Sequence, residues 1–181
     1  SVVDDFLSEL WEGYRPAKEI ELTTSPATGV TQKKLSDLAV AMNTLPDGPK
    51  FFRKVKKLMN DRLAMVDRDQ FDWAMGEMLA YGSLLMEGHP VRLSGQDVER
   101  GTFSHRHAVL KTEDAEEEWI LLNELKKDQS RMAVYNSHLS EYAVSGFEYG
   151  YAFANPHGLT IWEAQFGDFN NGAQIMWDQF L

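Results

Sequence analysis

The chain has 181 residues, 43% hydrophobic and 25% charged, which is typical of one globular domain and unlike disordered or collagenous chains. Its 28 acidic and 18 basic side chains give a formal net charge of −10. Such a field repels phosphate backbones and anionic bilayers, so we expect no nucleic acid and no membrane as partner. Cysteine is absent, which excludes disulfides, thiolate metal sites and cysteine nucleophiles.

The charge is distributed unevenly along the chain. Residues 1–70 carry 11 acidic and 11 basic side chains, so the whole acidic excess lies in residues 71–181. No apolar run approaches the roughly 20 residues of a membrane-spanning helix. The first residues lack an initiator Met and the layout of a signal peptide, and residues 175–181 stop in an amphipathic stretch with no helix-ending residue. We expect a fragment of a longer polypeptide.

Helical segments and a connector are predicted for the first 70 residues. Apolar residues recur at helical spacing in 2–12, whereas 14–30 contain prolines and no sustained period, which indicates an extended connector. Two further helices are expected at 31–42, with Thr31 at the N-cap, and at 51–66. The four basic residues at the start of the last helix are interpreted as a solvated face rather than as a patch for an anionic partner.

From residue 71 onward, helices and strands alternate. Helices are predicted at 71–87, at 140–154 and from 168 on, and strands at 91–94, 132–136 and 159–163. This order predicts an α/β domain with a parallel sheet, in which ligands bind outside the carboxyl ends of the strands. Residues 111–130 contain an acidic run and are interpreted as a solvated surface insertion without a chemical role.

Three patterns near those strand ends have both a functional and an ordinary interpretation. Glu141 opens a helix, where a carboxylate binds a ligand or simply stabilises the helix end. His105 and His107 share one face if the chain is extended, and suit a metal or an oxyanion, although no third ligand is recognisable. Phe166 and Phe169 suit stacking on a flat heterocycle or packing in the core. Spacing alone leaves these alternatives open.

Five sequence blocks, taken together, resemble one family in order and spacing. They are VRLSGQD at 91–97, RGTFSHRHAV at 100–109, YNSHLSEYAV at 135–144, GFEYGYA at 146–152 and WEAQFGDF at 162–169. They are similar to the thiamine-dependent dehydrogenase component of the 2-oxoglutarate dehydrogenase complex. The resemblance implies an incomplete transketolase-like pyrimidine-binding fold, α/β with a parallel sheet, over residues 71–181. Residues 1–70 resemble the helical interdomain segment that precedes it.

The family resemblance also implies an activity. Family members use thiamine diphosphate and Mg²⁺ to decarboxylate 2-oxoglutarate, and pass the succinyl group to a lipoyl domain in the tricarboxylic acid cycle. It implies a homodimer, a lipoyl-bearing succinyltransferase partner, and a location in the bacterial cytoplasm or the mitochondrial matrix. A relative that acts on 2-oxoadipate, a carboligating decarboxylase and a non-catalytic dimerisation domain are the alternatives.

A departure from the family pattern concerns the metal. The family's Mg²⁺ motif places an Asn well downstream of its Gly-Asp pair, whereas here the Gly-Asp at 167–168 is followed at once by Asn170 and Asn171. We therefore expect no metal ligands in this chain. The ligands of Mg²⁺ and of the diphosphate are expected elsewhere in the parent chain, and the isolated chain is expected to be inactive.

Residue roles follow from the resemblance by position. Glu141 matches the glutamate that hydrogen-bonds the aminopyrimidine ring of the cofactor, and is the expected catalytic residue. Phe166 and Phe169 match the aromatic pair beside that ring, and Leu139 matches the side chain that supports the bent cofactor. The family's active-centre loop, expected to contact substrate, corresponds to Gln96, Asp97, Arg100, His105 and His107.

Overall fold

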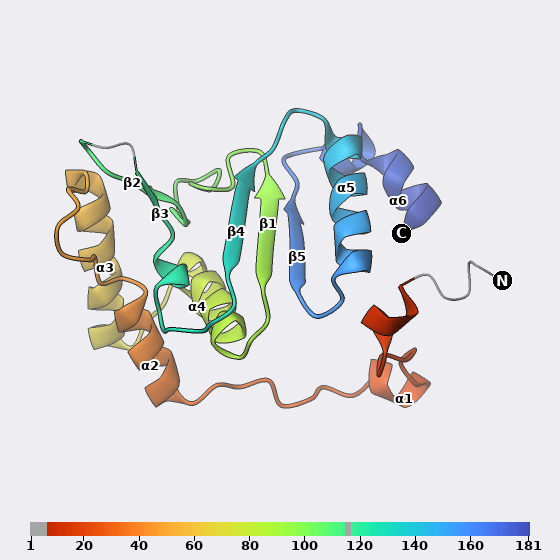
Figure 1. The fold of residues 1–181 in the computed structure, drawn as a ribbon, viewed down its shortest axis with the longest axis horizontal. Coiled ribbons are helices and arrows are strands. Elements are labelled where there is room, and N and C mark those ends of the chain that lie inside the picture. The colour runs from red at the N-terminus through yellow and green to blue at the C-terminus, as the bar shows by residue number, and fades with distance from the viewer. Residues whose placement is uncertain (1–6, 115–116) are drawn as a thin grey trace.

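Three parallel strands form the centre of the structure, a computed structural model that describes residues 7–114 and 117–181. They are β1 (Val91–Gly95), β4 (Met132–Asn136) and β5 (Leu159–Glu163), in the order β4-β1-β5 (Figure 1). The register pairs Val91 with both Met132 and Leu159, so the three strands start and end together. The predicted α/β class and the three predicted strands are confirmed.

Two helices cover opposite faces of this sheet. They are α4 (Trp73–Met86) and α5 (Glu141–Ala154). Side chains alternate along a strand, so Leu93 of β1 packs with α4 in the buried core, whereas Arg92 points to α5. There the Nε of Arg92 donates a hydrogen bond of 2.7 Å to Glu148. This alternation fixes which strand residues stabilise the core and which position α5.

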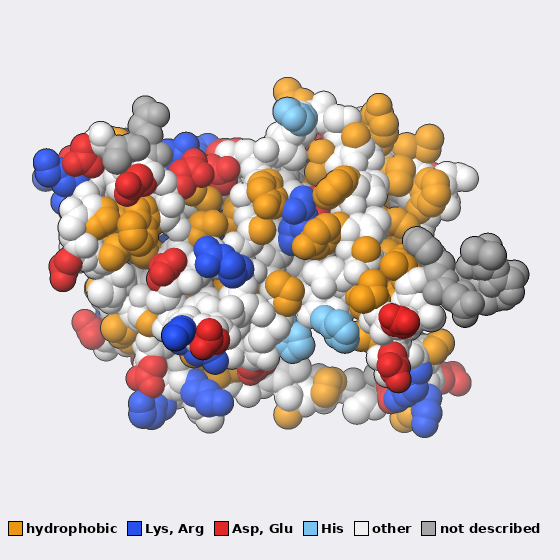
Figure 2. Space-filling model, viewed as in Figure 1, with side chains coloured by type: hydrophobic (Ala, Val, Ile, Leu, Met, Phe, Trp, Pro, Cys, Tyr) orange, Lys and Arg blue, Asp and Glu red, His pale blue; other side chains and the backbone are white. Residues whose placement is uncertain are grey.

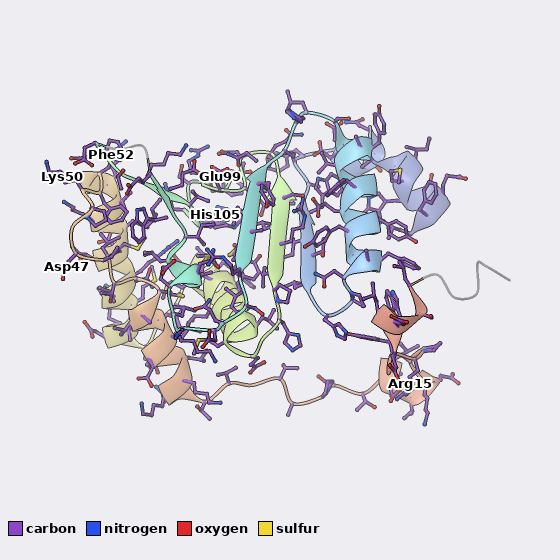
Figure 3. The ribbon with its side chains drawn as sticks, viewed as in Figure 1. Arg15, Asp47, Lys50, Phe52, Glu99 and His105 are labelled. Atoms are coloured by element: carbon purple, nitrogen blue, oxygen red, sulfur yellow. The ribbon has the colours of Figure 1, made fainter. Side chains whose placement is uncertain are left out.

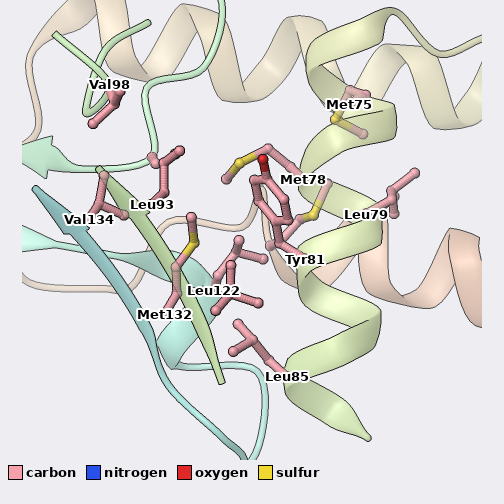
Figure 4. Close-up of a cluster of buried hydrophobic side chains, with 14 residues drawn as sticks. Met75, Met78, Leu79, Tyr81, Leu85, Leu93, Val98, Leu122, Met132 and Val134 are labelled. Carbon is pink, nitrogen blue, oxygen red and sulfur yellow. The ribbon is translucent and has the colours of Figure 1, made fainter. Parts of the chain in front are cut away.

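The main core lies between α4 and the sheet. Met78 and Leu85 of α4 face Leu93 and Met132 of the strands, whereas Met75 lies on the side of α4 away from them; all five are buried (Figure 4). Each fully buried apolar side chain of this size contributes about 1.5–3 kcal/mol. This core holds the strand ends, and therefore the loops after them, in fixed positions.

The helix α4 begins two residues later than the sequence predicts. Asp72 is its N-cap, because the Asp72 carboxylate accepts a hydrogen bond of 2.8 Å from the backbone N–H of Met75. Trp73, the first helical residue, is 94% exposed. The buried face of α4 thus starts only at Ala74.

The described part of residues 1–70 forms helical segments of 4 to 16 residues. They are η1 (Ser8–Trp11), α1 (Glu19–Leu22), α2 (Gln32–Ala41) and α3 (Arg53–Arg68). The helix predicted at 2–12 is described only from residue 7 onward, and that part contains a 3₁₀ turn. The basic residues that open α3 are exposed, as predicted. Met42, just after α2, is buried in the main core with Met75.

The predicted connector at 14–30 is extended only in part. It contains α1, because the carboxylate of Glu21 accepts a hydrogen bond from the backbone N–H of Lys18 at 2.7 Å and pairs with Arg15. Beyond α1 the chain runs along one edge of the molecule to α2 (Figure 1). Just before this connector, the indole N–H of Trp11 donates a hydrogen bond of 2.8 Å to the carbonyl of Phe153 at the end of α5.

The prediction of a solvated insertion at 111–130 is wrong in part: the described residues of its acidic run are exposed, but the segment also contributes buried residues to the core. Its strand β3 (Glu118–Trp119) pairs antiparallel with β2 (Leu110–Lys111), and the turn η2 (Leu121–Asn123) follows. Leu122 is completely buried in the main core, and Leu121 is buried in a second, smaller cluster. The burial of Leu121 and Leu122 was not predicted, because the apolar stretch that follows the acidic run is too short to show a helical or strand period.

The last segment packs beside α5. The turn η3 (Asp168–Asn170) leads to α6 (Gln174–Phe180), which lies along α5 (Figure 1). Apolar side chains gather on the surface over these two helices (Figure 2), among them Phe147 and Phe180. None of the helices within the described residues is both long and apolar enough to cross a bilayer.

Candidate functional site

The carboxyl ends of the three strands meet at one edge of the sheet. Gly95 pairs with Asn136 on one side and with Glu163 on the other. The loops that follow these residues are joined directly: the backbone N–H of Ser137 donates to the carbonyl of Gly95 at 2.8 Å, and the amide of Gln165 donates to the carbonyl of Gln96 at 3.1 Å. All the segments predicted to carry the site therefore come together here.

Glu141 stands at this edge as the first residue of α5. Its side chain is partly buried and lies against Gly172, where a Cβ would come within 2.6 Å of the Glu141 Oε2 atom. Within the described part of the chain, the carboxylate makes no hydrogen bond and no ion pair. Ser140 occupies the N-cap, but its side chain makes no capping hydrogen bond. Glu141 is thus a carboxylate whose oxygens are available to a ligand.

The apolar residues assigned to the cofactor lie beside the same edge. Leu139, just before α5, is 81% exposed, and Phe166, three residues after β5, is 87% exposed. The side chain of Phe169 lies outside what the structure describes. An exposed aromatic ring and an exposed Leu at the edge of the sheet that also carries Glu141 suit a flat, partly polar ring better than they suit water.

The 96–107 loop, which follows β1, has an unusual backbone. Asp97, Ser104 and His107 have positive φ values of 58°, 53° and 45°, a conformation that costs a residue other than glycine about 1–3 kcal/mol. Arg100 pairs with Asp97 and donates a hydrogen bond of 2.6 Å to the Ser104 hydroxyl. The hydrogen bond to Asp97 raises the pKa of Arg100. Such strain concentrates at functional sites.

The two histidines of this loop do not share a face. His105 lines a cavity of about 320 Å³ together with Phe103 and Phe166, whereas His107 lines a different cavity of about 340 Å³ with Arg100. The extended geometry that would align them is absent, because Ser104 and His107 both have positive φ. Figure 3 shows Glu99 and His105 on this loop, beside β4 in that view.

The environments of the two imidazoles also differ. Burial, and the charges of Arg62 and Arg100, lower the pKa of His107, so its ring is neutral at pH 7. The Nδ1 atom of His105 is buried and has no hydrogen-bond partner among the described residues. It packs against Gly101, where a Cβ would come within 2.6 Å of it.

Sequence reasoning missed a buried charge cluster beside this cavity. Arg106 is 1% exposed and pairs with both Glu77 of α4 and Glu163 of β5. Burial opposes its charge, but the hydrogen bonds to the two glutamates outweigh burial and raise the pKa of Arg106. The sequence contained one indication of a buried ion pair: Glu77 is the one charged residue in the otherwise uncharged helix α4.

This cluster also has the outline of a metal site. Ligand atoms of Glu77, His105 and Glu163 lie within 4.8 Å of one another. The guanidinium of Arg106 already donates hydrogen bonds to both carboxylates, so a cation that used them as ligands would have to displace a buried arginine. We assign no metal to these residues.

Comparisons with known proteins agree with this geometry. Residues 69–181 match the family described as transketolase, pyrimidine binding domain. The chain is 46% identical to the mitochondrial 2-oxoglutarate dehydrogenase of Dictyostelium discoideum, over 98% of the chain and 18% of that protein. It is 49% identical to the 2-oxoglutarate dehydrogenase E1 component of Rickettsia felis, over 97% and 18%. It is 44% identical to the 2-oxoglutarate dehydrogenase E1 component of Brucella ovis, over 98% of the chain and 18% of that protein. The chain thus spans less than a fifth of the length of these curated relatives.

Proposed function

The chain belongs to the family of transketolase pyrimidine-binding domains, and on that premise we propose that it supplies the pyrimidine side of a thiamine diphosphate site in a 2-oxoglutarate dehydrogenase. In this proposal the parent enzyme decarboxylates 2-oxoglutarate and transfers the succinyl group to a lipoyl-bearing succinyltransferase. The names and identities of the relatives support the substrate.

The observation that carries the proposal is the unpartnered carboxylate of Glu141. Most other buried or partly buried acids in this part of the fold are paired: Glu148 binds Arg92, and the Asp168 carboxylate accepts from the backbone N–H of Gln165. Glu99, on the 96–107 loop, is a second partly buried acid without such a partner among the described residues. Glu141 is partly buried without such a partner, which is costly unless a ligand supplies one. A protonated or hydrogen-bond-donating ring nitrogen is a suitable partner for it.

The residues present fit the ring of the cofactor. The lack of a Cβ at Gly172 leaves room for the Glu141 carboxylate, and the exposed Phe166 and Leu139 offer an apolar wall. We propose that Phe169 belongs to the same wall. When bound, thiamine diphosphate supplies the carbon nucleophile that attacks the keto carbon. Glu141 holds a proton at the ring nitrogen, which sets the protonation of the amino group beside it.

We assign substrate and channel contacts to the 96–107 loop. Gln96, Asp97, Arg100, His105 and His107 lie on it, next to the strand ends. The neutral imidazole of His107 is able both to donate and to accept a hydrogen bond. The buried arginines here are engaged: Arg106 with two glutamates, and Arg62 with backbone carbonyls. We therefore propose that Mg²⁺ and the diphosphate are held by other parts of the parent chain.

The remaining proposals concern organisation. We propose a boundary near residue 70 between a helical interdomain segment (1–70) and the pyrimidine-binding domain (71–181), which is supported by the family match from residue 69. We also propose a homodimer. We propose a location in the mitochondrial matrix or the bacterial cytoplasm, because one relative is named as mitochondrial and others are bacterial.

The test is an activity assay of the full-length parent enzyme. We expect 2-oxoglutarate to reduce an artificial electron acceptor only when thiamine diphosphate and Mg²⁺ are present, and 2-oxoadipate to react more slowly. A preference for 2-oxoadipate would change the assigned substrate. Equal rates with and without the cofactor, after its removal has been verified, would overturn the proposal.

A further inference from the structure

We propose that Arg106 is a positioning residue that fixes the 96–107 loop against the end of β5, and so places the candidate substrate contacts relative to the candidate cofactor wall. This inference rests on the proposed function. It concerns a residue for which neither the family resemblance nor the comparisons supplied a role.

All five N–H donors of Arg106 are used. Its Nε and Nη2 donate to the two carboxylate oxygens of Glu77, at 2.5 and 3.1 Å. Its Nη1 donates to the carbonyl of Val98 at 2.9 Å and to Glu163 Oε1 at 3.1 Å, and its Nη2 also donates to Glu163 Oε2. A guanidinium has five donors in a fixed planar fork. The direction of each partner is therefore set by the geometry of the arginine.

The partners come from three different parts of the fold. Glu77 lies on the core helix α4, Glu163 is the last residue of β5, and Val98 belongs to the 96–107 loop itself. Glu163 is followed within three residues by Phe166, the exposed ring of the proposed cofactor wall. Arg106 therefore connects the rigid core, the loop and the segment that carries this ring.

The loop requires such a connection because its backbone is strained. Of the six residues other than glycine with positive φ among those described, three lie in it: Asp97, Ser104 and His107. Strained backbone persists only where its surroundings impose it. Arg62 adds to this restraint, since its Nη2 donates to the carbonyls of His105 and Arg106 at 2.8 and 2.6 Å.

A second link leaves the contribution of Arg106 separable from folding. Gln165 bridges the same two segments, because its amide nitrogen donates to the carbonyl of Gln96 and to the hydroxyl of Thr102. Without Arg106 the segments remain joined there, but Glu77 and Glu163 become two like charges that share one cavity wall. Their repulsion pushes the end of β5 away from α4 and releases the loop.

Lysine is a suitable replacement because it keeps the charge and loses the geometry. Arg106→Lys leaves one cation beside both glutamates, with three donors from a single nitrogen in place of the planar fork. Arg92→Lys is the matched control. Arg92 is also a largely buried arginine with two hydrogen bonds to one glutamate, Glu148, at 2.7 and 2.9 Å, but it lies on the face of the sheet covered by α5.

The experiment measures backbone hydrogen exchange and kinetics in the full-length enzyme. In the absence of cofactor and substrate, we expect Arg106→Lys to accelerate exchange in the peptide covering 96–107 by at least about tenfold, and Arg92→Lys to leave that peptide unchanged. At saturating thiamine diphosphate, we expect kcat for 2-oxoglutarate to fall about 10- to 100-fold in Arg106→Lys, the loss typical of misplaced reacting groups. Arg92→Lys is a control for hydrogen exchange only, because Arg92 holds α5, the helix that begins with Glu141.

A second variant guards against a folding defect. Glu77→Gln keeps the Arg106–Glu163 pair and leaves one acceptor at position 77 for the arginine. We therefore expect a smaller increase in the exchange of 96–107 and a smaller fall in kcat than in Arg106→Lys. If 96–107 exchanges at the wild-type rate in both variants, or if kcat per cofactor-binding site is unchanged while exchange is faster, Arg106 does not position the site. If the wild-type enzyme does not turn over 2-oxoglutarate, the proposed function fails, and the exchange data still decide whether Arg106 holds the loop.

Discussion

Glu141→Gln in the full-length enzyme distinguishes two roles of Glu141: a carboxylate that takes part in catalysis, and a charge that only stabilises the start of a helix. A carboxylate in the first turn of a helix contributes about 0.3–1 kcal/mol. The described structure gives Glu141 no ion pair or hydrogen bond beyond that. For a unit of 150–250 residues, such a loss lowers the unfolding midpoint by about 2–4 °C at most. Loss of a positioned acid or base, by contrast, costs about 10²–10⁴-fold in rate.

The assay is reduction of an artificial electron acceptor driven by 2-oxoglutarate, with thiamine diphosphate and Mg²⁺ saturating. We expect kcat to fall at least about 100-fold in Glu141→Gln. Cofactor affinity, titrated by the quenching of tryptophan fluorescence, is expected to change less than kcat. Ser140→Ala is the control: Ser140 holds the N-cap position without a capping hydrogen bond, so both the rate and the unfolding midpoint are expected to stay at wild-type values.

Two results would refute this reasoning. A kcat within about threefold of wild type, with a midpoint lowered by a few degrees, would show that Glu141 only interacts with the helix dipole. A large loss of cofactor affinity, with kcat near the wild-type value once the cofactor is saturating, would show that Glu141 binds the cofactor without taking part in its activation, since uniform binding does not raise kcat once the site is saturated.

The other predictions concern the support of the site, the core and pH. Gly172→Ala places a Cβ 2.6 Å from Glu141 Oε2, so the carboxylate must move, and we expect kcat to fall at saturating cofactor while the fold, followed by circular dichroism, stays intact. Leu122→Ala, at a fully buried position, is expected to lower the free energy of unfolding by about 2–5 kcal/mol, whereas Leu22→Ala, at a 76% exposed position, is expected to change it by less than about 0.5 kcal/mol. Equal effects would mean that the 111–130 segment is not part of the core. The pKa of His107 is lowered by burial and nearby positive charge, so below its unfolded pKa of about 6.5 the unfolded state binds more protons, and stability falls as pH drops. We expect His107→Gln to reduce the slope of the unfolding midpoint against pH between about 6.5 and 5; an unchanged slope would contradict the lowered pKa.

Elements with a clear period or clear boundaries were predictable from sequence. The strands of the sheet are short apolar runs followed by turn or loop residues, and the sequence places β4 and β5 at the residues where the structure has them. The position of Glu141 was predictable in the same way, because the residue after a strand and at the start of a helix falls at the carboxyl edge of a parallel sheet. These inferences need only neighbouring residues.

Contacts between distant residues could not be predicted. The partners of Arg106 lie 29 and 57 positions away, and no period relates them. His105 and His107 point to different cavities because Ser104 and His107 have positive φ. Tertiary contacts, rather than the residue types, impose this backbone conformation. Sequence spacing assumes a regular backbone, so it fails where the chain is strained, and those are the places where functional loops are found.

The arrangement of charge explains why the structure singles out Glu141. The chain has 28 acidic residues, and sequence alone does not distinguish them. The fold pairs Glu77 and Glu163 with one arginine and Glu148 with another, which stabilises each charge where it is partly removed from water. Glu141 has no such pairing, although it is partly buried at the edge where the strands end. Glu99, on the 96–107 loop, is also partly buried without a partner among the described residues, but Glu141 is the one that opens α5 beside the proposed cofactor wall. A carboxylate left without an arginine at this place is free to exchange a proton with a ligand.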